Sequence, residues 1–370
     1  MYKVTLAFLY IYISKCSSLK VSIIGGGPAG LLAGISFAKN GHDVSIMEKI
    51  LPNKKRKIHT NYLITKRGQN ALNRFNIKSD DVSMDINDLI TNISGKVTEE
   101  KTINYKSINR YNLIQSITNK TKEYKNISFE KDTLSDIDLK NKKVITRNGK
   151  TDYDILIGAD GIDSRVRSIL SKKNENFNFK VEHDRQTFQR FTMNKDFFQS
   201  LDNYEPSWDK TIHVWKGKSE ILATPDINGN INGIIYNSPY SSYQTNNIDH
   251  FNKNLNLNLS RVRDQKYIYC SHAALDNIIL IGDALHGVPN RLGQSINSAL
   301  EDVVCVDRCI PWIEKVNQDY FIELYNSCRI EDAHSVCKAV KMVSDRYGKQ
   351  DLKILRYIGE PEYNYSDIIK

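Results

Sequence analysis

The hydrophobic pattern of the chain is that of buried strands alternating with helices. Short apolar runs stand at 21–24, 155–157 and 278–281, and each run leads into a glycine. Runs of this length are typical of strands that are buried on both faces of a parallel sheet. Apolar residues at 31, 32, 35 and 38 follow a helical spacing, and Asn40-Gly41 is a usual helix end. This alternation predicts the α/β class.

The end of the chain has a helical pattern. Within residues 320–348, Phe321, Leu324, Val336 and Val340 lie at the spacing of one apolar helix face. A polar stretch after Gly293 also predicts a helix. The C-terminal part of the chain is therefore expected to be helical.

The first predicted strand leads into a glycine motif. Gly25, Gly27 and Gly30 fill the pattern G-x-G-x-x-G, and Glu48 ends the next predicted strand. The first glycine permits a tight turn, the second lets a pyrophosphate reach the backbone, and the third lets helix and strand pack closely. The helix N-terminus favours phosphate charge, and the acid can accept hydrogen bonds from a ribose. Strand, glycines, helix and acid together predict a dinucleotide site.

Two further apolar strands are each followed by an aspartate at a turn. Asp160 precedes a predicted helix that opens at Ser164, and Asp283 follows Gly282. An ionised carboxylate at the end of a buried strand needs hydrogen-bonding partners. We expect Asp160 to cap its helix and to hold a cofactor-facing turn, and Asp283 to meet cofactor hydroxyls. His286 is interpreted as structural rather than as a general base.

Taken together, these motifs resemble those of the flavin-dependent aromatic hydroxylases, the single-component FAD monooxygenases. The resemblance rests on the glycine turn, on GADGIDSRVR at 158–167 and on GDALHGVP at 282–289. Four further segments look like those of kynurenine 3-monooxygenases: NYLITKRGQNAL at 61–72, YKSINRYNL at 105–113, HVWKGKSEILATPDINGNINGIIY at 213–236 and RIEDAHSV at 329–336. The resemblance covers residues 19–345.

The resemblance implies a fold, a reaction and a domain plan. The fold is a Rossmann-like FAD-binding domain of the glutathione-reductase and p-hydroxybenzoate-hydroxylase type, with an inserted mixed β-sheet lobe and C-terminal helices. The reaction is hydroxylation of an aromatic small molecule with FAD, O₂ and either NADPH or NADH. The implied plan is a leader or extension at 1–18, an FAD domain at 19–175 and 270–310, a substrate lobe at 176–269 and a helical segment at 311–370.

The same resemblance implies a set of cofactor contacts beyond the glycines, Glu48 and the two aspartates. Arg110 would lie by the FAD, where a guanidinium suits a phosphate. The other implied contacts are Ala29, Leu63, Leu134, Ile296 and Asn297. No catalytic side chain is expected because the flavin carries the chemistry. No metal site is expected either.

The sequence departs from the kynurenine hydroxylases where the substrate should bind. Asp88 stands where that family has a carboxylate-binding arginine, and an acid there would repel a carboxylate. In the flavin loop, VPNRLGQSIN at 288–297, Asn290-Arg291 and Ser295 replace the family's residues. Asp88 and Arg291 are the two candidate substrate residues.

Three interpretations of the function therefore stay open. The first is a hydroxylase for a different, less acidic aromatic compound. The second is a kynurenine hydroxylase with a remodelled site. The third is an FAD-binding NAD(P)H oxidase or a non-hydroxylating regulatory flavoprotein.

Composition narrows the partners and the location. The net charge is +9, but lysine is spread along the chain and only 53–57 forms a tight basic run, so no nucleic-acid partner is expected. The six cysteines lack metal-site spacing and suit a reducing, cytoplasmic location. The apolar stretch between Lys3 and Lys15 is too short to span a bilayer. Targeting or membrane association would depend on this stretch alone.

Overall fold

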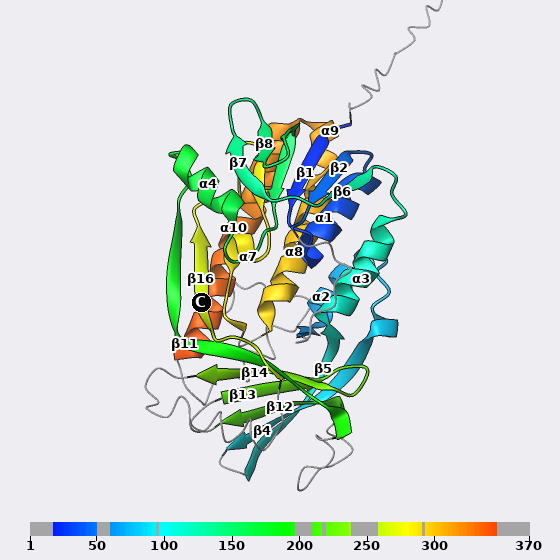
Figure 1. Ribbon diagram of the computed structural model, residues 1–370, viewed down its shortest axis with the longest axis vertical. Coiled ribbons are helices and arrows are strands. Elements are labelled where there is room, and N and C mark those ends of the chain that lie inside the picture. The colour runs from blue at the N-terminus through cyan, green and yellow to red at the C-terminus, as the bar shows by residue number, and fades with distance from the viewer. Residues whose placement is uncertain are drawn as a thin grey trace, which may run out of the picture.

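The structure is a computed structural model. It describes residues 18–49, 60–93, 96–196, 209–216, 220–237, 258–290 and 293–345. Figure 1 shows two bodies: a parallel sheet with helices around it, and a larger twisted sheet across one end. The helices in chain order are α1 (Pro28–Lys39), α2 (Lys66–Arg74), η1 (Asp80–Val82), α3 (Arg110–Thr121), α4 (Arg165–Lys173), α7 (Asp283–His286), α8 (Gln294–Cys309), α9 (Pro311–Lys315) and α10 (Gln318–Asp345).

The parallel sheet contains the strands that the apolar runs predicted. Its order is β17 (Ala274–Leu275), β18 (Ile278–Leu280), β10 (Ile155–Gly158), β1 (Lys20–Ile24), β2 (Asp43–Met47) and β6 (Ile127–Glu130). All pairs are parallel except β17 with β18. The glycine turn after β1 and the aspartates after β10 and β18 therefore share the carboxyl edge of three adjacent strands. This is the edge at which open α/β sheets bind their ligands.

Helices α1 and α8 pack against each other beside this sheet. Helix α1 begins at Pro28, directly after the glycine turn, and Asn40 caps its end as the sequence predicted. Helix α8 begins directly after Gly293, also as predicted. A small sheet of β7 (Leu134–Asp138), β8 (Lys143–Thr146) and β9 (Lys150–Asp152) precedes β10. The apolar faces of these elements form one continuous core.

The larger sheet has nine strands within the described residues and is drawn from two parts of the chain. One part is β3 (Asn61–Ile64), β4 (Ser83–Ile93) and β5 (Lys96–Asn109). The other is β11 (Phe179–Met193), β12 (Thr211–Lys216), β13 (Glu220–Pro225), β14 (Ile231–Asn237), β15 (Asn258–Leu259) and β16 (Arg263–Cys270). It is mixed, because β12 pairs parallel with β4. The expected lobe at 176–269 thus shares its sheet with strands from 61–109, and the domain boundaries stay a prediction.

Strand register divides the larger sheet into two faces. Leu222 pairs with Val214 on one side and with Ile234 on the other, and Ile234 pairs with Arg190. These side chains share a face with the apolar cluster Ile86, Leu89, Ile212 and Val214, to which Leu63 and Tyr105 add. We call this face the Leu63 face. The opposite face carries His213 and Ala223, which pair in register.

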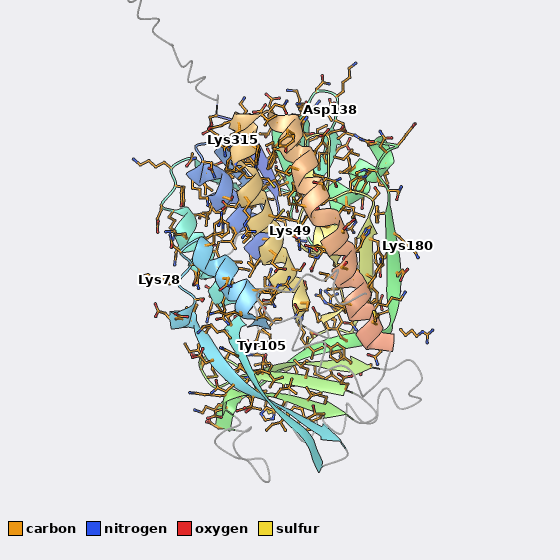
Figure 2. The ribbon with its side chains drawn as sticks, turned by 180° about the vertical axis from the view of Figure 1, so that it is seen from behind. Lys49, Lys78, Tyr105, Asp138, Lys180 and Lys315 are labelled. Carbon is orange, nitrogen blue, oxygen red and sulfur yellow. The ribbon has the colours of Figure 1, made fainter. Side chains whose placement is uncertain are left out.

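The long helix α10 connects the two bodies. It runs from the parallel sheet to the larger sheet, as Figure 2 shows from behind. Phe321, Val336 and Val340 are buried and Leu324 is partly buried, as the helical spacing predicted. The described residues contain no helix that is both long and apolar enough to cross a membrane. The N-terminal apolar stretch lies outside the described residues.

Candidate functional site

The glycine turn is closed against the neighbouring strand and open toward solvent. Gly25 has φ +114°, and a Cβ there would lie 2.2 Å from the carbonyl oxygen of Ala159. A Cβ on Gly30 would lie 2.0 Å from the carbonyl oxygen of Gly25. A Cβ on Gly27, in contrast, would meet no atom within 4 Å. The turn therefore leaves space at Gly27, where a pyrophosphate is expected to approach.

Glu48 supports this turn from the next strand. The backbone N–H of Gly26 donates to Oε2 of Glu48 at 2.8 Å. Glu48 follows β2 at the carboxyl edge of the sheet. In Figure 2 its neighbour Lys49 lies in the middle of the molecule, on the side of the parallel sheet that faces the larger one. Glu48 thus holds the turn and stands where a ribose hydroxyl is expected.

Asp160 lies beside the same turn and holds the start of α4. Its Oδ2 accepts from the backbone N–H groups of Arg165 at 2.7 Å and Val166 at 3.2 Å. The capping residue itself is Ser164, whose hydroxyl accepts from the N–H of Arg167 at 3.0 Å. Oδ1 of Asp160 is buried and has no hydrogen-bond partner within the described ranges. A buried acceptor of this kind calls for a donor.

Arg167 ties this second motif to the third. Its guanidinium donates to the carbonyl oxygens of Ala284 at 2.8 Å and Ile162 at 2.7 Å. Burial lowers the pKa of Arg167, although Cys270 and Asp160 act in the opposite direction. Arg167 thereby holds the loop after β10 next to the loop after β18.

The third motif, Gly282-Asp283, packs directly on the start of α1. A Cβ on Gly282, which has φ +60°, would lie 3.8 Å from Cβ of Ala29 and 3.3 Å from Cβ of Ala299. Oδ1 of Asp283 accepts a hydrogen bond from the Ser295 hydroxyl. Ser295, which replaces the family's residue, is therefore a partner of the predicted cofactor ligand.

The start of α8 is fastened to strand β3 by Asn297. Its side-chain oxygen accepts from the N–H of Thr65 at 3.0 Å, and its amide donates to the carbonyl oxygens of Leu63 at 2.8 Å and Gly293 at 2.9 Å. Asn297 is fully buried, and its neighbour Ile296 is nearly so. Asn297 thus brings Leu63 and Ile296 to one place, and a polar contact of its own with the flavin stays a prediction.

Tyr62 is a residue that the sequence reasoning missed. Arg110 donates from Nε to the Tyr62 hydroxyl at 3.0 Å, and the N–H of Arg110 donates to the carbonyl oxygen of Thr60. Burial raises the pKa of Tyr62, nearby Arg110 lowers it, and Asp283 raises it again. The net shift is upward, so the phenol stays protonated at neutral pH. Its signal in the sequence was its place beside Leu63 in the 61–72 segment.

Two other predicted residues, Asp88 and Leu134, lie on strands β4 and β7. Asp88 pairs in register with Thr211, so it lies with His213 on the face opposite Leu63. Asp88 is therefore not on the Leu63 face, and a role for it toward the substrate stays a prediction. Leu134 is buried in the core on β7. Arg291 lies outside the described residues.

Comparisons with known proteins agree with this geometry. Residues 19–197 match the family model described as pyridine nucleotide-disulphide oxidoreductase. A kynurenine 3-monooxygenase of Legionella pneumophila (strain Lens) is 27% identical over 341 residues, which cover 78% of this chain and 72% of that protein.

Solved structures show the same fold. A tetrameric 2-methyl-3-hydroxypyridine-5-carboxylic acid oxygenase has a TM-score of 0.75 at 15% identity, with 94% of this chain and 99% of that chain covered. PqsL of P. aeruginosa, solved with 2-aminobenzoylacetate, has a TM-score of 0.72 at 14% identity, with 92% of this chain and 99% of that chain covered. The comparisons support an FAD-dependent aromatic monooxygenase.

The predicted resemblance and fold class are thereby confirmed, and the comparisons support FAD with a nicotinamide reductant as the cofactors. The residues present also fit FAD on two observations of their own. Space is left at Gly27 for a phosphate, and Asp160 offers an unsatisfied buried acceptor at the edge of the same turn. Among the residues that the structure describes, no group of three or more His, Cys, Asp or Glu side chains could hold a metal.

Proposed function

We propose that the chain holds FAD along the carboxyl edge of its parallel sheet and uses it to hydroxylate an aromatic small molecule with NAD(P)H and O₂. The observation that carries this proposal is the convergence of three sequence motifs. Gly25, Ala159 and Gly282 come from three adjacent strands, and their loops pack on one another around the start of α1. FAD, when bound, supplies electron transfer from NAD(P)H and the activation of O₂.

Individual residues have distinct proposed roles toward this cofactor. The Gly27 backbone and the start of α1 receive the pyrophosphate, and Glu48 receives the adenosine ribose. Asp160 and Asp283 accept hydrogen bonds from the cofactor's hydroxyls. Arg110, held by Tyr62 through Nε, presents the rest of its guanidinium to a phosphate.

The substrate's place is proposed on the Leu63 face of the larger sheet. Leu63 lies against Gly293 at the start of α8, where the flavin ring is expected, and the apolar cluster around Ile212 and Val214 continues from it. An apolar wall of this kind receives an aromatic ring and excludes water. Arg190 lies on the same face, its guanidinium carbon 5.3 Å from the centre of the Phe188 ring, and offers positive charge to an anionic substituent.

The position of Asp88 bears on whether kynurenine can be the substrate. Because Asp88 lies on the face opposite the proposed substrate place, we expect it neither to bind nor to repel a substrate carboxylate. The family's carboxylate-binding arginine is nonetheless absent from that position. We therefore propose an aromatic substrate whose anionic group, if present, is met by a different cation, and kynurenine belongs in the test as one compound among several.

The test is product analysis with the FAD-loaded chain. NADH or NADPH consumption is followed with L-kynurenine, other aromatic carboxylates and their uncharged analogues, and product mass and hydrogen peroxide are measured together. The proposal expects at least one compound to accelerate NAD(P)H consumption and to gain one oxygen atom. Peroxide release without any oxygenated product would instead establish an NAD(P)H oxidase. The cytoplasmic location, expected from the cysteine pattern, stays a prediction.

A further inference from the structure

A buried network of charges lies directly behind the Gly282-Asp283 loop. Its centre is Asp302 on α8, which has no exposed surface. Oδ2 of Asp302 accepts from the backbone N–H of Gly282 at 2.6 Å and pairs with Nε2 of His286 at 2.7 Å. Oδ1 accepts from Nε of Arg329, on α10, at 2.6 Å. The guanidinium of Arg329 also donates to the Ser298 hydroxyl at 3.0 Å.

The charges of this network depend on one another. Burial alone would raise the pKa of Asp302, but His286, Arg329 and the Gly282 N–H outweigh burial and lower it. Burial would likewise lower the pKa of Arg329, and the Asp302 charge raises it instead. Asp302 is therefore an ionised carboxylate in a dry site. A carboxylate of this kind is a stronger acceptor for a backbone N–H than a neutral group is.

The hydrogen bond between Asp302 and the Gly282 N–H fixes the residue at which the chain turns out of strand β18. Gly282 has φ +60° and ψ −142°, a conformation that only glycine adopts readily. This residue turns the chain out of the strand and so sets the direction in which Asp283 leaves it. Asp302 accepts a hydrogen bond from the N–H of Gly282, and the Ser295 hydroxyl donates one to the Asp283 carboxylate. The two contacts act on successive residues of one loop.

We propose that Asp302, held by Arg329 and His286, is a positioning residue that aims Asp283 at the flavin cofactor. The inference rests on the proposed function, because it assumes that Asp283 contacts FAD. Asp302 holds the residues on both sides of Asp283: the Gly282 N–H before it and His286 at the end of α7. Since Arg329 belongs to α10, the C-terminal helix contributes to the cofactor site from behind the sheet.

Helix α8 supplies a matched control, Asp307. This residue is also buried, and it also binds two cations: Lys39 at 2.5 Å and Arg74 at 2.7 Å. Its third partner is the Ser36 hydroxyl at 2.6 Å, near the far end of α1 from the glycine turn. Asp307→Asn therefore disturbs a buried charge of the same helix without touching the Gly282 loop.

The experiment compares FAD binding and the flavin's spectrum in full-length wild type, Asp302→Asn and Asp307→Asn. The dissociation constant of FAD is measured by fluorescence quenching, and the environment of the bound flavin by visible circular dichroism. The expected result for Asp302→Asn is a rise of about tenfold in the dissociation constant, as for loss of one hydrogen bond to a charged group, and an altered flavin spectrum. Asp307→Asn is expected to stay within about twofold of wild type and to keep its spectrum.

Three further variants keep the proposal testable if Asp302→Asn does not fold. His286→Gln keeps a donor toward Asp302 and is expected to retain more FAD affinity than His286→Leu. Arg329→Lys keeps the charge but loses the second donor to Ser298, and an intermediate loss is expected. Equal FAD affinity and equal spectra for His286→Gln and His286→Leu, or for Asp302→Asn and Asp307→Asn, would overturn the positioning role. If wild type itself binds no FAD, the proposed function fails first, and that outcome is distinct.

Discussion

The middle and the C-terminal end of helix α8 differ in what their buried carboxylates, Asp302 and Asp307, hold together. Asp302, in the middle of the helix, joins the Gly282 loop to α10, and its partners Arg329 and His286 are almost fully enclosed. Asp307, nearer the end, joins α8 to α1 and α2 through Lys39 and Arg74, whose side chains are 33% and 41% exposed. The chemistry of the two sites is alike and their surroundings are not. The difference is that Asp302 contacts the backbone of the Gly282 loop, whereas Asp307 joins helices to one another.

The largest expected effect comes from closing the turn at the cofactor end. In Gly25→Ala the new methyl group would overlap the Ala159 carbonyl, and φ +114° would strain the backbone. We expect a loss of about 4 kcal/mol in the free energy of unfolding and loss of FAD binding, since overlap and strain add. Urea unfolding of the apo-protein measures the first effect. A stability equal to that of wild type would contradict the close contact of the turn with β10.

The second effect tests the two carboxylates by stability rather than by cofactor affinity. Removing one charge from a fully buried network leaves its partners uncompensated, and we expect Asp302→Asn to cost about 3 kcal/mol. For Asp307→Asn we expect about 1 kcal/mol, because its cations reach solvent and are screened. Chemical unfolding of both apo-variants measures the difference. A larger loss in Asp307→Asn would reverse the comparison.

The third effect separates the cofactor site from the fold. Gly27 has φ −75° and space around it, so Gly27→Ala should leave the free energy of unfolding of the apo-protein within about 0.5 kcal/mol of wild type. The methyl group would occupy the space for the pyrophosphate, and FAD affinity should fall about tenfold, or about 1.4 kcal/mol. Titration with FAD measures this. Unchanged FAD affinity in Gly27→Ala would show that the pyrophosphate does not bind at the Gly27 backbone.

A fourth effect is a dependence of stability on acid pH. The pKa values of Asp302 and Asp307 are both lowered, each because cations and donors outweigh burial. Their stabilisation is fully present above the unfolded carboxyl pKa of about 3.9 and is lost as the pH falls toward the folded values. Unfolding of apo-protein between about pH 2 and pH 5 should show stability rising with pH, with a shallower rise in each Asn variant. Identical slopes in wild type and variants would show that neither carboxylate is ionised in the folded chain.

The smallest expected effect belongs to Asp88. Because it lies on the face opposite Leu63, Asp88→Asn should leave FAD affinity and substrate KM unchanged, and stability within about 0.5 kcal/mol. Steady-state kinetics with the accepted substrate measure KM. A clear change in KM for carboxylated substrates alone would restore Asp88 to the substrate site.

The strands and turns at the carboxyl edge of the parallel sheet could be predicted from the sequence. Each motif combines an apolar run, which marks a strand, with a glycine that marks the turn after it. Gly25 and Gly282 mark turns with positive φ, and the apolar runs before them mark strands of one sheet. The start of α8 after Gly293 could be predicted for the same reason.

The rest depended on contacts between distant segments. A β-bulge between Ile86 and Asp88 breaks the alternation of side chains, so no period-two pattern could assign Asp88 to a face. Strands β3 to β5 enter the larger sheet through pairing with β12, which is far away in sequence. The partnership of Asp302 with Arg329 crosses from one helix to another and leaves no local pattern. Tyr62 became a candidate only when the fold brought Arg110 to it.

The most direct test of the account is titration of the purified apo-chain with FAD, with Gly27→Ala measured in parallel. The account predicts saturable binding of one FAD per chain, a flavin absorption band that stays with the protein, and about tenfold weaker binding by the variant. An apo-chain that is folded by circular dichroism and binds no FAD would contradict the account, as would equal affinity in wild type and Gly27→Ala.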